Sequence, residues 1–430
     1  MSKVVSVVKE EGLSVDEAPL GGGERFSVRQ LIGIGLITRL FMATGTQMFF
    51  PFLPIIASGM GISTIAMGRL ISLRSVVGLV SPFFGALADR RGYRQVMRIG
   101  LFLSALAYFL LGSSNAVWMA ALGMMLAGLG SFIFTPALQA YLSARMPYAR
   151  RARGLGVLEY SWALAGIVGL FAVGQLIEIS SWRVPMFLIG GTLFVAGVFY
   201  KQLPSVGQLG EIAPTEQHAA REMAPTDSAT QPTWKQVVSF FDLGANNRST
   251  WATMWASGFI MFAALHVFIS YGSWLSEEYG LSAGQLGQVA FVLGCGDLCG
   301  SVLVSVLNDR IGKRRGFLWG CGVSCVGFFV MPFFNTALVP AVIGIILARS
   351  SFEFTIVGSI PLLSEQVPEQ RGKVLTLRST TTFLGGVIAG FSSPWAYAHY
   401  GAWGLGLVSG VSMLIAFLLI VAFVRDAAAV

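Results

Sequence analysis

Seven charged side chains lie deep inside long apolar runs, and they are the residues of this sequence best suited to do chemistry. Four are arginines and three are carboxylates: Arg39, Arg74, Arg349, Arg378, Glu159, Asp297 and Glu353. A charge in an apolar interior is costly, so it is kept where it meets another charge, a proton or a charged ligand. A buried carboxyl group can exchange a proton, and a guanidinium can bind an anion.

The rest of the chain predicts helices that carry these charges across a membrane. Of 430 residues, 54% are hydrophobic and 12% are charged, whereas soluble domains contain about 25% charged residues. This composition excludes a soluble globular enzyme and predicts an all-α, multi-pass membrane protein. Twelve apolar segments are predicted to span the bilayer, at about 31–57, 64–87, 96–114, 116–144, 153–177, 183–203, 250–274, 283–307, 316–334, 338–364, 372–397 and 402–424.

The segments fall into two sets of six. Residues 31–203 and 250–425 each form a predicted six-helix bundle, 1–30 and 426–430 are tails, and 204–249 is a polar linker. Trp234, Val237 and Phe241 in the linker recur at helical spacing, which predicts either a short interfacial helix or a run-in to the seventh segment. Basic residues gather in the loops after segments 2, 4 and 8, so both termini are predicted to be cytoplasmic and the protein to lie in the cell (inner) membrane.

One loop motif occurs in each half. Gly85, Asp89, Arg90, Gly92 and Arg94 follow the second segment, and Asp309, Arg310, Gly312 and Arg314 follow the eighth, at an offset of 220 residues (309 − 89 and 312 − 92). The carboxylate can meet the positive N-terminus of a neighbouring helix, and the glycine permits a tight turn. The repeat indicates a duplicated six-helix unit, an organisation found in many secondary transporters.

The motif, its position, the number of segments and the central linker together resemble the major facilitator superfamily, and within it the twelve-helix drug and sugar efflux branch. The fifth segment, from Arg153-Gly154 to Trp162, is of the kind found in that branch. The resemblance implies an all-α fold of two pseudo-symmetric six-helix bundles. It also implies that the motif loop is a latch that closes the cytoplasmic side; the alternative is a basic loop that only sets the topology.

The same resemblance implies where the helices that carry the deep charges lie in the fold. In the superfamily helices 3, 6, 9 and 12 face lipid, and all seven deep charges lie on the other eight helices. Asp297 is the first candidate for proton coupling because it lies 12 residues before Asp309, which is roughly 18 Å of helix and hence near mid-membrane. The alternative is a protonated carboxyl group that only hydrogen-bonds a neighbouring helix. Arg39 is expected either to bind substrate or to pair with Asp297 or Glu353 across the cavity.

The other charges have two interpretations each. Glu159 is a second titrating group or the ion-pair partner of an arginine such as Arg378. Arg349 and Glu353 lie four residues apart on one helix face and are able to pair, either as a structural pair or as a site where substrate or proton competes. The candidates for proton coupling are therefore Asp297, Glu159 and Glu353, and those for substrate binding are Arg39, Arg349, Arg378, Arg74 and Trp162.

No constellation typical of an enzyme is present, since the chain has neither a phosphate-binding glycine loop nor a histidine cluster. We expect no cofactor beyond the proton as coupling ion, no metal, no nucleic-acid partner, and a monomer in contact with membrane lipids. Cys295 and Cys299, and Cys321 and Cys325, are spaced so that four thiolates are able to hold zinc, but their small neighbours favour close helix contacts.

These expectations combine into a proton-coupled secondary transporter that exports a small organic solute by alternating access. Two alternatives remain open. One is a flippase or carrier for an amphipathic lipid or an organic anion, which the excess of arginine would suit. The other is a non-transporting membrane sensor.

Overall fold

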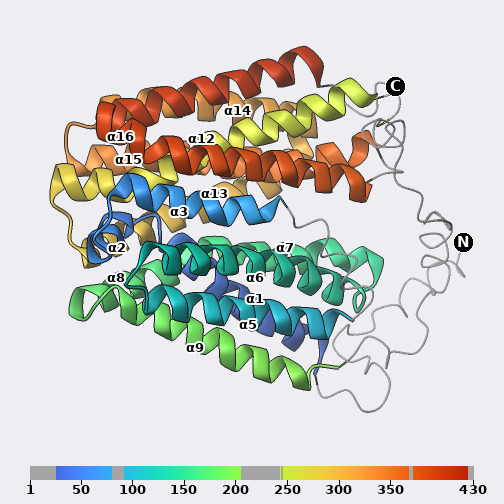
Figure 1. Ribbon diagram of the computed structural model, residues 1–430. Coiled ribbons are helices and arrows are strands. Elements are labelled where there is room, and N and C mark those ends of the chain that lie inside the picture. Colours follow the sequence, from blue (N-terminus) through green and yellow to red (C-terminus); the bar gives the residue numbers. More distant parts are fainter. Residues whose placement is uncertain (1–25, 80–91, 205–242, 244–245, 368–370, 425–430) are drawn as a thin grey trace, which may run out of the picture.

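The described part of the chain consists of helices joined by short connections, with no strand among them (Figure 1). The computed structural model describes residues 26–79, 92–204, 243, 246–367 and 371–424. Within its helices, it leaves undescribed the side chains at 148–150, 152–153, 304–310, 313, 351, 353–354, 357–358, 360–361, 364–365 and 371–372.

The first half holds the elements up to residue 202. They are α1 (Val28–Gln47), α2 (Leu53–Gly59), α3 (Thr64–Gly78), α5 (Tyr93–Gly112), α6 (Val117–Ser143), α7 (Tyr148–Leu164), the π-helix η1 (Ala165–Leu170), α8 (Phe171–Ile179), α9 (Arg183–Phe199) and the 3₁₀ turn η2 (Tyr200–Gln202). Ser27 and Gln30 form a capping box at the start of α1, and the Ser63 side chain caps α3. These caps set where both helices begin, and hence the register of the arginines that they carry.

The second half repeats this plan. It contains α12 (Asn247–Tyr279), α13 (Ala283–Ile311), α14 (Lys313–Val330), the 3₁₀ turn η5 (Met331–Phe334), α15 (Leu338–Gln366) and α16 (Arg371–Phe423). The last is two helices joined at Gly401, whose φ is 57°. Among the described residues, eight helical stretches are long and apolar enough to cross a membrane, and the pair α2 and α3, bent by 106°, forms a ninth. With α1 and α15 added and α16 counted as two helices, the described residues of each half form six helical spans, as predicted.

The first predicted segment differs from the structure. The interval 31–57 was expected to be one helix, but α1 ends at Gln47 and α2 begins at Leu53. Pro51 and Pro54 explain the break, because proline lacks a backbone N–H and disfavours helical geometry in the residue before it. The connecting turn is buried, with Met48 and Phe52 at 0% exposure.

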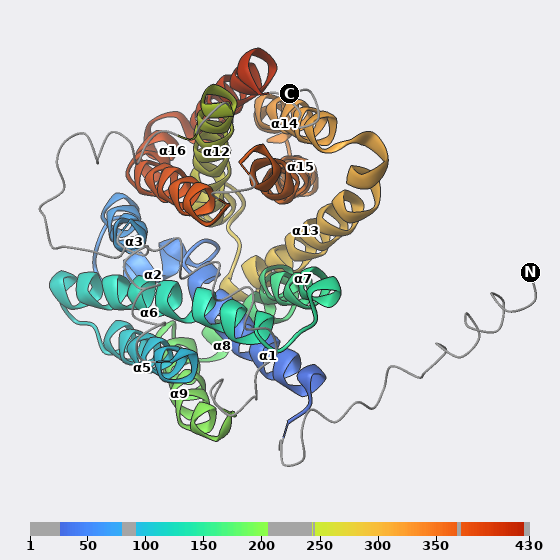
Figure 2. The same cartoon turned by 90° about the vertical axis from the view of Figure 1, so that its right-hand side faces the viewer.

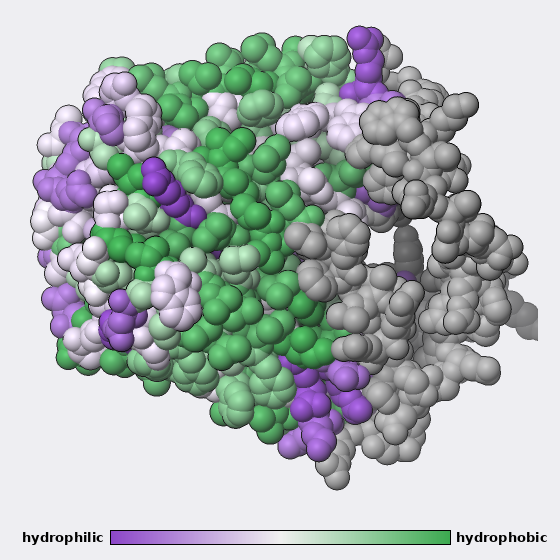
Figure 3. Space-filling model, viewed as in Figure 1, coloured by the Kyte–Doolittle hydropathy of each residue, from purple (hydrophilic) through white to green (hydrophobic). Residues whose placement is uncertain are grey.

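The outer helices are the ones expected to face lipid. Viewed from the end at which the described chain begins and stops, at Phe26 and Val424, α5 and α9 lie at the margin of one half, and α14 and the last part of α16 lie at the margin of the other (Figure 2). Exposed large apolar side chains such as Phe194 on α9 and Val326 on α14 cover these margins. They contribute to a broad apolar surface, with hydrophilic residues towards the two ends (Figure 3).

Glycines bring the two halves together at the end opposite the termini. Gly166 and Gly174, on η1 and α8, contact the backbone of α13 at Gly294 and Gly287, and a Cβ on any of the four would come within 3.1 Å of the facing backbone. Such contacts between small residues let helix backbones approach closely. The Glu178 side chain also accepts a hydrogen bond of 2.9 Å from the backbone N–H of Gly284, in the first turn of α13.

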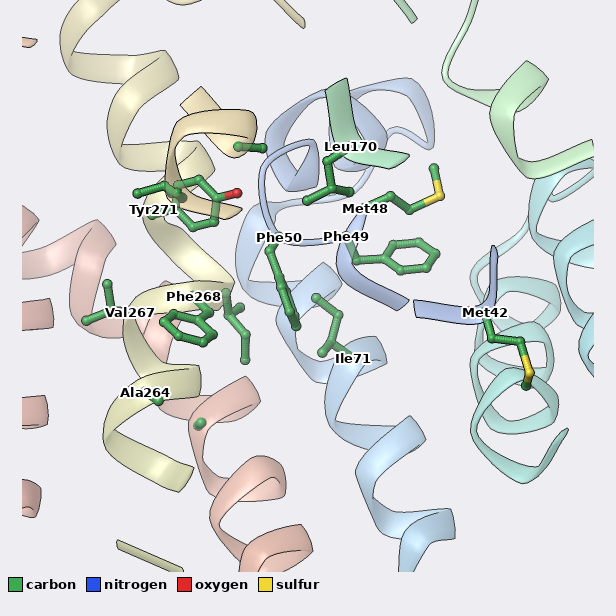
Figure 4. Close-up of a cluster of buried hydrophobic side chains, with 14 of the residues drawn as sticks. Met42, Met48, Phe49, Phe50, Ile71, Leu170, Ala264, Val267, Phe268 and Tyr271 are labelled. Carbon is green, nitrogen blue, oxygen red and sulfur yellow. The ribbon is translucent and has the colours of Figure 1, made fainter. Parts of the chain in front are cut away.

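The same end is closed on its other side by α3, α12 and the turn at 48–52. The Ser72 hydroxyl donates to the Val387 carbonyl of α16 at 2.9 Å. A Cβ at Gly272 of α12 would collide with the carbonyl oxygens of Phe50 and Pro51. Figure 4 shows Phe50, from the turn, lying between Phe268 of α12 and Ile71 of α3. We call the contacts of this end, from both sides, the seal.

Candidate functional site

A cavity of about 550 Å³ lies between the two halves. Its walls come from α1, α3, α6 and α7 of the first half and from α16 of the second, and it is lined by Arg39, Met42, Ala43, Thr46, Arg74, Ser131, Phe132, Thr135, Pro136, Gln139, Ser161, Trp162, Thr376, Ser379 and Phe383. The lining reaches Gln139, one turn before the end of α6, at the end of the molecule opposite the seal. The cavity thus extends away from the seal.

One residue of the cavity lining, Arg39, forms an ion pair. The Nη1 of Arg39 donates to Oε1 of Glu159 at 2.8 Å and its Nη2 donates to Oε2 at 3.3 Å, so the contact between α1 and α7 is bidentate. Gln139 of α6 also donates to Oε1, at 3.2 Å. The Glu159 side chain is 59% exposed and that of Arg39 14% exposed. The carboxylate is therefore open to solvent while the guanidinium is held in the wall.

Arg74 lies deeper in the same cavity. Its Nη2 donates to the Thr46 hydroxyl at 2.5 Å, and its backbone lies against Gly128 of α6, where a Cβ would approach to 2.7 Å. Thr46 is seven residues after Arg39, two helical turns further along the same face of α1. Within the described part of the chain no carboxylate pairs with Arg74. Arg69, on the same helix, is exposed instead.

Arg378 of α16 lies beside two residues of the cavity lining, Thr376 and Ser379. Its Nη2 donates to the Ser359 hydroxyl of α15 at 3.0 Å. Its Nε is buried with no hydrogen-bond partner. No ion pair with a carboxylate is formed by Arg378 among the described residues.

A second ion pair is buried inside the second half. Nε of Arg349 on α15 lies 3.1 Å from Oδ1 of Asp297 on α13, and Nη2 lies 2.5 Å from Oδ2. The two side chains are 5% and 2% exposed. The guanidinium also lies over the ring of Phe268, 4.0 Å from its centroid. Gly272, one turn after Phe268 on α12, belongs to the seal.

The observed pairings differ in part from the predicted ones. Glu159 is the ion-pair partner of an arginine, as one interpretation predicted, but that arginine is Arg39, and Arg378 bonds to Ser359. The partner observed for Arg39 is thus Glu159, not Asp297. Arg349 binds Asp297, and its predicted pairing with Glu353 stays a prediction. The side chain of Glu353 lies outside the described residues. Residue spacing within one helix could not predict these contacts, because each of them joins two helices.

Trp162 lines the cavity, and its role in substrate binding stays a prediction. The neighbouring backbone carries a feature that the sequence did not predict. η1 begins three residues after Trp162, and the Gln47 amide of α1 donates to the Trp162 carbonyl at 2.9 Å. A π-helix widens one turn and is frequent at functional sites.

The motif loops are described in part. Gly85, Asp89 and Arg90 lie outside the described residues, as do the side chains of Asp309 and Arg310, so the latch stays a prediction. Gly92 and Gly312 have φ of 81° and 91° directly before α5 and α14, which confirms the tight turns. Arg94 donates to the Leu203 carbonyl at 2.9 Å, and Arg314 donates to the Val424 carbonyl at 2.7 Å.

The cysteines lie on crowded helices. A Cβ at Gly294, beside Cys295, would meet η1, and one at Gly300, beside Cys299, would meet the Ser350 backbone. Cys321 and Cys325 face the Met413 and Gly410 carbonyls of α16. Close helix contact therefore explains the small residues around the cysteines.

Sequence reasoning missed the neutral part of the site. Gln139 and Thr46 bond to the charged groups and Gln47 bonds to the Trp162 carbonyl, yet the candidates for proton coupling and substrate binding were ionisable residues apart from Trp162. Glutamine within an apolar segment is a signal that was available. The glycines of the seal, spaced along the fifth and eighth segments, were another.

Comparisons with known proteins agree with this architecture. The family model described as Major Facilitator Superfamily matches the chain twice, at residues 35–273 and 254–429. An uncharacterized MFS-type transporter of Bacillus subtilis, YceJ, is 22% identical over 370 residues, which cover 84% of this chain and 88% of that protein. The multidrug resistance protein MdtG of Klebsiella pneumoniae is 24% identical over 362 residues, covering 83% and 84%.

A solved structure has the same fold. It is the crystal structure of a bacterial homolog to the human lysosomal transporter Spinster, in an inward-facing and unoccupied conformation. The TM-score is 0.70 at 13% identity, and the match covers 93% of this chain and 98% of that one.

Proposed function

The chain belongs to the Major Facilitator Superfamily and is a secondary transporter, not an enzyme, and from this premise we propose that it exports a small organic solute in exchange for protons, with Asp297 as the proton-binding group. The supporting observation is the buried Asp297–Arg349 pair, which links a titratable carboxylate to the helix that forms part of the seal.

The proposed coupling follows from charge. A proton on Asp297 removes the negative charge that faces the Arg349 guanidinium, and a buried ion pair that loses one partner is strongly destabilised. Arg349 rests on Phe268, and α12 meets Phe50 and Pro51 one turn further on, at Gly272. Protonation therefore acts against the arrangement in which the seal is closed.

Access of the proton depends on the same contacts. Asp297 lies three residues after Gly294, on nearly the same face of α13, and Gly294 is in backbone contact with η1. While the seal is closed, the carboxylate is 2% exposed. Separation of α13 from η1 opens this face to the other side of the membrane, so the proton and the solute reach their sites from opposite sides.

Two observations support export. Relatives such as MdtG are described as multidrug resistance proteins. The basic loops also favour a cytoplasmic position for the end at which the described chain begins and stops, and the cavity lining reaches towards that end at Gln139. Solute then loads from the cytoplasm while the seal is closed on the outside.

The test uses purified protein in proteoliposomes and a ligand found by thermal stabilisation. Equilibrium exchange of that ligand and its transport under an imposed pH gradient are measured separately. Asp297→Asn should retain exchange and lose the dependence on the gradient. Glu277→Gln, an exposed acid on α12, is the control and should behave as the wild type. Undiminished gradient dependence in Asp297→Asn, with loss in Glu159→Gln, would move the proton site to the cavity and overturn the assignment.

A further inference from the structure

We infer that the solute carried by this cavity is a small organic acid whose carboxylate binds the guanidinium of Arg74. The inference rests on the proposed transport function and deepens it, because it names the chemical class of the solute. The observation behind it is a deep arginine, in the wall of the central cavity, that no carboxylate of the described chain balances.

The charges of the cavity do not cancel. Arg39 and Arg74 belong to its lining, and the only acid bound to either of them among the described residues is Glu159, which pairs with Arg39. One positive charge, that of Arg74, remains. An unbalanced guanidinium among apolar helices is unfavourable, so an anion that enters the cavity lowers the free energy of the site.

Arg74 also has the donors for a carboxylate. Thr46 is the hydrogen-bond partner that the structure gives it. A guanidinium offers five N–H donors in a planar fork and binds carboxylates through two of them at once. The Thr46 hydroxyl itself donates to the Met42 carbonyl at 2.8 Å, which fixes its lone pair towards Arg74 and holds the fork in place.

A second arginine adds to the positive potential on the other side of the cavity. Arg378 follows Thr376 and precedes Ser379, both lining residues of α16, and its Nε is buried with no partner. Because Arg74 belongs to the first half and Arg378 to the second, an anion between the halves is attracted by both.

The remaining walls favour an organic body over an inorganic anion. The cavity of about 550 Å³ falls in the range of sites for small organic ligands, roughly 300 to 1,000 Å³. Trp162, Phe132 and Phe383 supply flat apolar surface, and the last two rings, from α6 and α16, lie 4.6 Å apart in an edge-to-face arrangement. A planar unsaturated body fits this wall while its carboxylate reaches Arg74.

The experiment measures binding to the purified full-length protein in detergent by titration calorimetry. The probes are benzoate, cinnamate and 2-naphthoate, their methyl esters, and 2-naphthylmethylamine. Each acid that binds should do so about 10- to 150-fold more tightly than its ester, the range expected for hydrogen bonds to a charged group. If no acid binds more tightly than its ester, or if the amine binds most tightly, the inference is wrong.

Variants locate the site. Arg74→Gln should reduce the affinity for the tightest of the acids to that of its ester, and Arg74→Lys should restore part of it. Arg69→Gln, an exposed arginine of the same helix, is the matched control and should bind as the wild type. If Arg74→Gln does not fold, the affinity of Arg74→Lys and the acid-to-ester affinity ratio of the wild type still test the inference. Displacement of the acid by inorganic phosphate at equal concentration would indicate an inorganic anion site and contradict the inference.

The experiments distinguish failure of the organic-acid inference from failure of the proposed proton coupling. Binding at constant pH does not require Asp297, so Asp297→Asn should keep the acid-to-ester preference. Normal acid binding by Arg74→Gln, together with loss of gradient dependence in Asp297→Asn, overturns the organic-acid assignment alone. The reverse pair of results overturns the proton assignment alone.

Discussion

Gly294→Ala should open the seal. In the structure a Cβ at this position would lie 2.7 Å from the backbone nitrogen of Ile167 and 2.9 Å from the carbonyl carbon of Gly166. Both are backbone atoms of η1, so rotamer changes cannot relieve the contact. Overpacking of this kind costs about 1 to 3 kcal/mol. In the proposed transport cycle α13 separates from η1 when the seal opens, so the penalty should apply to the sealed arrangement alone.

The expected shift follows from that difference. An energy of about 1 to 3 kcal/mol changes the ratio of sealed to open molecules by about 5- to 150-fold. Spin labels at Ile179 and Tyr400 report the ratio, since they lie at the sealed end on opposite halves and are 81% and 63% exposed. In a background without native cysteines, the distance distribution should gain a longer component.

Gly191→Ala is the matched control. It is another helical glycine, on α9, but a Cβ there meets nothing within 4 Å, so its distance distribution should match that of the parent protein. An unchanged distribution in well-folded Gly294→Ala would show that the contact between α13 and η1 does not set the balance between the two arrangements, and the reasoning about the seal would fail.

Two further predictions concern stability, measured by unfolding in detergent. Asp297→Asn removes the carboxylate bound to the buried Arg349 and should lower the free energy of unfolding by about 3 kcal/mol. Glu159→Gln removes a carboxylate that is 59% exposed and should lower it by at most about 1 kcal/mol. Equal losses in the two variants would refute the contrast between the buried and the exposed pair. Gly92→Ala and Gly312→Ala should each lose about 1 to 3 kcal/mol, because φ of 81° and 91° is strained for a residue with a Cβ. Gly156→Ala, with open space around its Cβ, is their control, and wild-type stability in either loop variant would contradict the positive φ.

Much of the fold was accessible from the sequence because the membrane imposes a simple rule. A helix that crosses the bilayer needs roughly 20 apolar residues, so helix positions follow from composition alone. The break at Pro51 is an exception that shows the limit. Its prolines were visible, but the apolar character of 48–52 concealed a turn that is buried against α12 rather than a helix that continues.

The candidate site, too, was predictable from the sequence only in part. Scarcity of charge in apolar segments was enough to select Arg39, Arg74, Glu159, Asp297, Arg349 and Arg378, and the structure places Arg39 and Arg74 in the cavity lining. The ion-pair partners of these residues could not be predicted. Glu159 and Arg39 are 120 residues apart and Asp297 and Arg349 are 52 apart, and pattern within one helix says nothing about which helices face each other.

By itself, then, the sequence determined which segments cross the membrane and showed that they form a repeated set of six. It also showed which charged side chains lie inside these segments, where an unpaired charge is energetically unfavourable. Only the tertiary structure decided which charges cancel. Ion-pair energy depends on a separation of a few ångströms between side chains of different helices. For Asp297 and Arg349 the two helices pack closely, since a Cβ at Gly300 of α13 would lie 2.7 Å from the Ser350 carbonyl oxygen of α15. Among the described residues a carboxylate pairs with Arg39 and none pairs with Arg74, and the proposal of an anionic solute rests on this difference, which the composition does not contain.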